Sequence, residues 1–433
     1  MHSPKQDGKI KLIQIYKKGL ITMNSLTFLH TADLHLDSPF QGLQSRIPME
    51  LYKRIQDSTF TSFTKVIDLA IRENVDFILI SGDLFDSADR SVRAQVRFRK
   101  EMKRLDEQGI SAYVIHGNHD HIGGDWTAIQ WPLNVHVFTN QEVEIQTFQK
   151  SGKPLANLYG FSYQEKAVTK NMVPLYEKEG DAAYHIGLLH GSAEGSLLEH
   201  NNYAPFTIKQ LLDKKFDYWA LGHIHKRQVL HEEPLIVYPG NIQGRHRKET
   251  GEKGCYIVKL TENNSKISFH QTADILWENV QVSIADISSY SHLLDYCFQT
   301  IEGFRRYDQG GVLLEVELIG SGALHKDLHD RNLVDDLLSI LIEAEQDKNN
   351  FVLVTTIRVH TTMMIERDKL KEESHFFGDL ITCIDEYDGF IDALGPLFNH
   401  PQARKYLNSL SMEEKRDIVK EAEAIILNEM LND

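Results

Sequence analysis

The strongest constraint on this chain is a pattern that recurs five times in its first half: a short apolar run followed by residues able to bind a metal ion. The runs are LTFL, FILI, YVI, IGLL and YWAL, which begin at Leu26, Phe77, Tyr113, Ile186 and Tyr218. Short runs of this kind, bounded by Gly, Asp or Asn, are typical of fully buried strands. Apolar residues at helical spacing over 50–73 separate the first two runs. Alternating strands and helices predict an α/β fold in which helices cover a sheet.

The residues that follow the five runs are rich in Asp, Asn and His. They read His30-Thr-Ala-Asp33-Leu-His35, Ser81-Gly-Asp83-Leu-Phe-Asp86, His116-Gly-Asn118-His119-Asp120-His121, His190-Gly and Gly222-His223-Ile-His225. A lone histidine at a strand end is usually structural, but ligands of open α/β sheets bind beyond the carboxyl ends of the strands. Five such ends in agreement therefore predict one shared site. On extended backbone, two residues spaced as in Asp-x-His or His-x-His point to the same side and reach one centre.

Close backbone approach is expected around this site, because glycines precede Asp83, Asn118 and His223. The donor set combines imidazole with carboxylate and amide oxygens and lacks thiolate, which favours Mn²⁺, Fe²⁺ or Zn²⁺. A pair of such ions would lie about 3.5–4 Å apart.

Composition bounds the partners and the compartment. The chain has 433 residues and a formal net charge of −15, so any contact with DNA must come from local features. Cys255, Cys297 and Cys383 are far apart, which favours a reducing compartment, and we expect the cytoplasm. No apolar segment approaches the roughly 20 residues that span a bilayer, so we expect no membrane association.

The order of the motifs, DxH, GDxxD, GNHD, H and GHxH, resembles the signature of calcineurin-like metallophosphoesterases over about the first 250 residues. HTADLHLDSP, GDLFD and YPGN at 238–241 resemble the SbcD-type DNA exonuclease branch, and within it the YhaO-like members. The resemblance implies a two-sheet α/β sandwich followed by a small α/β capping domain and a helical C-terminal tail. The expected boundaries are a flexible extension at 1–22, a nuclease domain at 23–272, a DNA-binding capping domain at 273–362 and a partner-binding helical region at 363–433.

The resemblance also implies roles for individual residues. One metal ion is held by Asp33, His35 and His225, the other by Asn118, His190 and His223, and Asp83 bridges the two. Manganese is the usual metal of the family. His119 resembles the general acid that protonates the leaving oxygen, and Asp120 is expected to orient it. His116 and His121 are expected to be bystanders, and Asp86, where some relatives have His, a turn or supporting residue.

Two basic clusters are weaker candidates for contact with substrate phosphate. Arg245 and Arg247 follow YPGN and are expected to contact substrate phosphate. The basic stretch 90–104 fits equally well a solvated helix face or a contact with the DNA backbone. An apolar stripe over 412–431 fits equally well a helix packed on its own domain and one that binds a partner.

The resulting hypothesis is a metal-dependent DNA exonuclease of the SbcD type, which acts as a homodimer with a coiled-coil ATPase of the SMC type. One alternative is a phosphodiesterase or phosphatase for small substrates. The other is a DNA-end scaffold that carries a regulatory metal site, against which the complete ligand set and His119 argue.

Overall fold

The structure is a computed structural model that describes residues 25–40, 42–44, 47–87, 90–124, 126–127, 129–139, 142–194, 203–308, 310–364, 367–373, 375–387, 389–402 and 410–432. The extension predicted at 1–22 lies outside the described residues. The described chain forms two compact units. The first contains the residues up to Glu278 with Arg305–Leu313 and Gln346–Leu353, and the second contains Asn279–Phe304, Leu314–Glu345 and the residues from Val354 onward.

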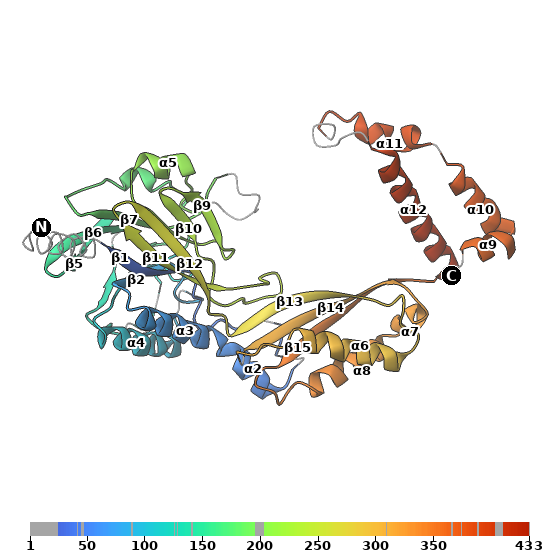
Figure 1. Cartoon of the computed structure of the whole chain (residues 1–433), viewed down its shortest axis with the longest axis horizontal. Coiled ribbons are helices and arrows are strands. Elements are labelled where there is room, and N and C mark those ends of the chain that lie inside the picture. Colours follow the sequence, from blue (N-terminus) through green and yellow to red (C-terminus); the bar gives the residue numbers. More distant parts are fainter. Residues whose placement is uncertain are drawn as a thin grey trace, which may run out of the picture. The chain divides into compact units, whose positions relative to one another are not determined.

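Two six-stranded sheets build the first unit (Figure 1). One has the order β12-β11-β1-β2-β3-β4, with β1 (Leu26–Thr31), β2 (Phe77–Ser81), β3 (Ser111–Ile115), β4 (Val135–Val137), β11 (Gly254–Thr261) and β12 (Asn264–Gln271). The other has the order β5-β6-β7-β8-β10-β9, with β5 (Glu144–Lys150), β6 (Lys153–Gly160), β7 (Tyr184–His190), β8 (Tyr218–Gly222), β9 (Gln228–Glu232) and β10 (Leu235–Tyr238). The remaining elements are α2 (Met49–Gln56), α3 (Ser58–Arg72), α4 (Val92–Asp106), η1 (Val173–Leu175) and α5 (Ile208–Asp213).

The central strands are buried on both faces, which explains their uninterrupted apolar runs. In β2, Phe77 and Leu79 belong to the core between the two sheets. Ile78 and Ile80 alternate with them and belong to the core beneath α3 and α4. A third core, which includes Trp219 and Leu221 of β8, lies on the outer side of the second sheet. Successive residues of a strand point to opposite faces, so a strand between two apolar layers has no polar position.

Strand direction brings the polar strand ends together. β1, β2 and β3 run parallel in the first sheet, and β7 and β8 run parallel in the second. His190, the last residue of β7, is paired with Gly222, the last residue of β8. The motifs that follow these five strands therefore leave the sandwich at the carboxyl ends, as predicted.

One helix differs from its prediction. Residues 50–73 were expected to form one helix, but the structure has α2 and α3, with a break at Asp57. The two helices have separate buried faces. Leu51 and Ile55 are buried on α2, and Phe63 and Val66 on α3.

The strands of the capping region form a three-stranded sheet, β13 (Ile275–Ser283), β14 (Gly311–Ser321) and β15 (Val352–Thr362). Helices α6 (Tyr290–Gly303), α7 (His325–Leu328) and α8 (Arg331–Glu343) accompany it, and α6 and α8 run along the sheet in Figure 1. The helical tail contains α9 (Arg367–Glu373), α10 (His375–Asp385), α11 (Phe390–Phe398) and α12 (Met412–Asn432). The predicted sandwich, small α/β domain and helical tail are confirmed, whereas the exact domain boundaries stay predictions.

The packed face of α12 coincides with the predicted stripe only in part. Leu427 is 2% exposed, and with Val419 it lines a cavity of about 1010 Å³ bounded by α9, α10, α12 and the ends of the capping strands. Arg367 of α9 forms an ion pair with Glu423 across this cavity. Ile425 is 65% exposed, and Ile418, Ile426 and Met430 are also exposed. The helix therefore packs on its own unit and also leaves apolar side chains uncovered.

Candidate metal centre

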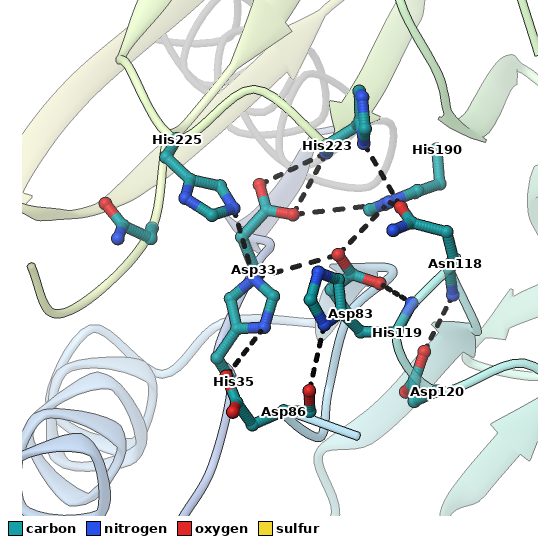
Figure 2. A network of polar contacts seen from close by, with 12 residues as sticks. Asp33, His35, Asp83, Asp86, Asn118, His119, Asp120, His190, His223 and His225 are labelled. Atoms are coloured by element: carbon teal, nitrogen blue, oxygen red, sulfur yellow. Dashed lines mark hydrogen bonds and ion pairs between the residues drawn. The ribbon is translucent and has the colours of Figure 1, made fainter. Parts of the chain in front are cut away.

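The seven predicted ligand residues lie together at the carboxyl ends of the central strands (Figure 2). Two groups of three residues have donor atoms within 4.8 Å of one another; the first equals a predicted set and the second overlaps with the other set and the bridging residue. They are Asp33, His35 and His225, and Asp33, Asp83 and His190. Residues up to 192 positions apart in the sequence thus form one cluster of donors, as the strand ends indicated.

Asp83 occupies the middle of the cluster. Its Oδ2 lies 3.4 Å from Nε2 of His190 and 3.7 Å from Nε2 of His35, which belong to different predicted metal positions. Its Oδ1 accepts a hydrogen bond from the backbone N–H of His119 at 2.9 Å. One oxygen of this carboxylate is therefore held by a backbone hydrogen bond, and the other faces both predicted metal positions.

The second predicted position is formed around the amide of Asn118. Its Oδ1 lies 3.1 Å from Nε2 of His190 and 3.2 Å from Nδ1 of His223. The backbone N–H of His223 in turn donates to the carboxylate of Asp33, at 3.0 Å to Oδ1 and 3.2 Å to Oδ2. Asp33, assigned to the first position, therefore also holds the segment that supplies the second.

The local backbone differs from the extended form that the Asp-x-His spacing predicted. Asp33, His35, Asp83 and His223 all have positive φ, at 52°, 42°, 50° and 96°. This region is unfavourable for residues with a Cβ, and such strain persists where the surrounding structure enforces it, often at functional sites. Backbone bonds between the strand ends supply that restraint: Asp33 N donates to Gly82 O at 3.1 Å and His35 N to Asp83 O at 3.0 Å.

Glycine is required where the chain passes closest to the donors. A Cβ added at Gly117 would lie 2.4 Å from Oδ1 of Asp83 and 2.6 Å from Nε2 of His190. A Cβ added at Gly222 would lie 1.8 Å from the carbonyl oxygen of Ser81. The expectation of close approach before Asn118 and His223 is confirmed by these distances.

Hydrogen bonds on the far side of two imidazoles orient their free nitrogens into the cluster. Nδ1 of His190 lies 2.9 Å from the carbonyl oxygen of Ser81, and Nδ1 of His225 lies 2.6 Å from Oε1 of Glu249. Both partners are acceptors, so Nδ1 carries the hydrogen, and in the neutral form of each ring Nε2 has the lone pair. This arrangement is typical of metal-binding histidines.

The donors fit divalent cations. Nε2 of His225 faces Nε2 of His35 at 3.1 Å, beside the carboxylate of Asp33. Ring nitrogens and carboxylate oxygens that converge in this way form a cage of electron-pair donors, which a cation satisfies.

Charge and burial set the protonation of the cluster. Burial lowers the pKa of His223 to about 3, so its ring is neutral near pH 7. Burial also acts to lower the pKa of His190, but the neighbouring Asp83 carboxylate outweighs it and raises that pKa to about 9. The same pairing holds the pKa of Asp83 well below its usual range against the effect of burial. A metal ion that binds His190 must therefore displace a proton.

His119 lies beside the cluster and its neighbour Asp120 beneath it. Nδ1 of His119 lies 2.9 Å from the carbonyl oxygen of Asp86, which leaves Nε2 available. Asp120 was expected to orient this ring, but its carboxylate accepts hydrogen bonds from the backbone N–H groups of Leu84 at 2.9 Å and Gly117 at 2.8 Å, and contacts Nδ1 of His116 at 2.8 Å. The structure therefore corrects that expectation: Asp120 and His116 hold the loop, and the backbone of Asp86 holds His119.

The basic stretch 90–104 has largely structural contacts. Arg90 is 2% exposed, stacks on Trp126 with its guanidinium carbon 3.8 Å from the ring centre, and donates to the carbonyl oxygens of Asp120 and His121. Arg93 forms ion pairs with Asp37 and Asp57, and Arg104 with Asp68 and Glu101. These pairs favour the solvated-face interpretation for Arg93 and Arg104.

The two arginines predicted to contact phosphate are placed differently. The Arg245 guanidinium forms an ion pair with Asp86, whose carbonyl holds His119, so Arg245 lies at the edge of the cluster. Arg247 is exposed. Asp86 is thus a supporting residue, and it also lies within 4.8 Å of donor atoms of His35 and His119.

Sequence reasoning missed Glu249 and the role of Arg90. Glu249 is separated from His225 by β9, β10 and a coil, and no spacing in the sequence connects them. Arg90 was grouped with a run of surface charges, and its burial beneath the 118–121 loop has no sequence signal.

Comparison with known proteins gives the family. Residues 26–227 match the model of the calcineurin-like phosphoesterase family, and residues 277–362 match the middle domain of metallophosphoesterase YhaO. The chain is similar to the metallophosphoesterase YhaO of Bacillus subtilis (strain 168), with 42% identity over 412 residues that cover 94% of this chain and 98% of that protein. The chain belongs to the YhaO family of metallophosphoesterases. Phosphoester hydrolysis at a binuclear divalent metal site is the activity of such a fold, and the donor cluster is this member's candidate site.

More distant similarity links this YhaO-family member to archaeal proteins named DNA double-strand break repair protein Mre11. The protein from Sulfolobus acidocaldarius is 35% identical over 70% of this chain and 77% of its own length. The protein from Sulfurisphaera tokodaii is 30% identical over 56% of this chain and 67% of its own length. Within the described part of the chain, no helix is both long enough and apolar enough to cross a membrane.

Proposed function

We propose that this protein is a manganese-dependent DNA nuclease that cleaves phosphodiester bonds at the ends of DNA. The observation that carries the proposal is the placement of Asp83 between the Asp33–His35–His225 group and the Asn118–His190–His223 group. Each of these two groups would hold one ion, and Asp83 would bind both ions. When bound, a pair of divalent ions activates water and neutralises charge on the phosphate.

His119 is the group placed to protonate the leaving oxygen. Its Nδ1 hydrogen is directed at the carbonyl of Asp86, so a proton on Nε2 faces away from that contact and is available for transfer. Arg245 would bind a phosphate oxygen of the substrate, and Arg247 would bind the backbone further along. Asp86 restrains Arg245 until substrate binds.

DNA is favoured as the substrate by the similarity to proteins named for double-strand break repair, which extends over most of the nuclease part of the chain. The match of residues 277–362 to a YhaO middle domain adds a capping region that hydrolysis of a small ester does not need. The competing function, a phosphodiesterase for small substrates, has the same metal centre and differs in its use of that region.

The test compares linear single- and double-stranded DNA with bis-p-nitrophenyl phosphate, in Mn²⁺, Mg²⁺ or chelator. We expect cleavage of DNA with Mn²⁺ and none with chelator. His119→Ala should lower the rate by about 10²–10⁴-fold with Mn²⁺ binding retained, whereas the matched variant His121→Ala should cleave at the wild-type rate. Hydrolysis of the small ester alone would replace this proposal with the phosphodiesterase.

We further propose that the helical tail binds a coiled-coil ATPase of the SMC type and that the protein acts as a homodimer. The support for the first is the row of exposed apolar residues on α12, Ile418, Ile425, Ile426 and Met430. Such a row at helical spacing suits a coiled-coil partner. Ile425→Glu should abolish co-elution with the ATPase and leave nuclease activity of the isolated protein unchanged, and light scattering would give the mass of the assembly.

A further inference from the structure

Glu249 is a buried carboxylate in the coil between β10 and β11, with 8% of its surface exposed. Its Oε1 lies 2.6 Å from Nδ1 of His225. Its Oε2 accepts hydrogen bonds from Nδ2 of Asn241 at 2.9 Å and from the backbone N–H of Arg245 at 2.7 Å. Because both oxygens are engaged, the carboxylate cannot turn away from His225 without losing contacts on its other side.

The consequence for His225 follows from the chemistry of imidazole. A neutral ring has one N–H and one lone pair, and either nitrogen can carry the hydrogen. The ionised Glu249 only accepts, so it selects the form with hydrogen on Nδ1. The lone pair of Nε2 then points into the donor group with Asp33 and His35, where a metal ligand is needed.

The other three histidines of the centre have different support. Nδ1 of His190 is held by a neutral backbone carbonyl, and Nδ1 of His35 lies 3.6 Å from Asp86, which is paired with Arg245. His223 directs Nδ1 itself at Asn118. Among these described histidines, His225 is the one with a carboxylate within hydrogen-bond distance of the nitrogen that faces away from the centre.

We propose that Glu249 is a positioning residue that sets the tautomer and orientation of His225 and thereby strengthens metal binding at the Asp33–His35–His225 position. This inference rests on the metal centre of the proposed function and extends it to a residue that does not touch the metal. Partners of this kind contribute about 10- to 100-fold to metal affinity. The Asn118–His190–His223 position does not depend on Glu249.

The test measures Mn²⁺ binding to the full-length protein by calorimetry, after removal of metal with chelator. We expect Glu249→Gln to weaken one of two Mn²⁺ equivalents by about 10- to 100-fold and to leave the other unchanged. Glu249→Asp keeps the charge and should recover part of the loss. Glu252→Gln is the matched control, because Glu252 lies in the same coil and pairs with exposed Arg227 at 3.4 Å.

Two outcomes would overturn the inference. Glu249→Gln with wild-type affinity for both equivalents and a lower Tm would show that Glu249 only holds the loop. Independently of any variant, nitrogen NMR of the metal-free wild type should find hydrogen on Nδ1 of His225, and hydrogen on Nε2 would contradict the proposal. Wild-type protein that binds two Mn²⁺ ions but leaves DNA intact would remove the nuclease proposal and keep this one.

Discussion

The hydroxyl of Tyr218 lies 2.9 Å from Nδ1 of His30, and this contact joins the two sheets beneath the metal centre. The other ring nitrogen of His30 lies 3.2 Å from the hydroxyl of Ser81, whose carbonyl oxygen holds His190. A buried histidine thus connects both sheets with a metal-ligand candidate. Burial lowers the pKa of His30 to about 3.

The first prediction follows from that pKa. The unfolded chain binds a proton at His30 below about pH 6.5, whereas the folded protein does not until about pH 3. The free energy of unfolding therefore decreases as the pH is lowered through this window. This residue should lower it by about 2 kcal/mol between pH 7 and pH 5. Urea unfolding measures the free energy of unfolding at both pH values. Between pH 7 and pH 5, it should decrease by about 2 kcal/mol less in His30→Asn than in the wild type. An unchanged slope would assign the proton uptake to other groups.

The second prediction concerns the close approach at Gly117. The Cβ of Gly117→Ala would overlap Oδ1 of Asp83 and Nε2 of His190, so we expect Mn²⁺ affinity to fall by tenfold or more. Gly303→Ala is the control, because its added Cβ would meet nothing within 4 Å beyond the adjacent residues and the backbone of its own helix. Calorimetry with both variants measures the difference, and wild-type affinity in Gly117→Ala would contradict the placement of these donors.

The third prediction separates substrate binding from metal binding. Arg245→Gln removes a hydrogen-bond donor to phosphate worth about 1.5–3 kcal/mol, so KM for DNA should rise by about 10- to 100-fold. Mn²⁺ affinity should stay at the wild-type value. Arg72→Gln changes the charge equally at an exposed pair with Glu73 and serves as the control. An unchanged KM would remove Arg245 from the substrate site.

The fourth prediction distinguishes the two faces of α12. Leu427 is buried and Ile425 is 65% exposed. Leu427→Ala should lower the stability of the tail by about 2 kcal/mol or more, as for other buried leucines. Ile425→Ala should change it by less than about 0.5 kcal/mol. Resistance of the tail to limited proteolysis measures the effect of each variant. Equal effects of the two variants would contradict the burial of Leu427 and the exposure of Ile425.

The sequence allowed the central strands and their polar ends to be predicted because burial on both faces leaves a continuous apolar run. The edge strands β5 and β12 were missed, since their alternating exposure resembles ordinary surface sequence. Metal-ligand candidates were found because each lies at the end of a strand or within a few residues after it. Glu249 and Arg90 act on residues distant in sequence, through contacts that exist only in the folded chain. The left-handed backbone at Asp33 was also missed, because no glycine marks it.

The left-handed conformations of Asp33, His35, Asp83 and His223 have a consequence for how the protein becomes active. The rest of the sandwich maintains these unfavourable conformations, so the coordinating groups are assembled before any ion arrives. Backbone hydrogen bonds between neighbouring strand ends hold this strain in place. A substitution that breaks one of those bonds, even far from any donor atom, would therefore displace several coordinating side chains together.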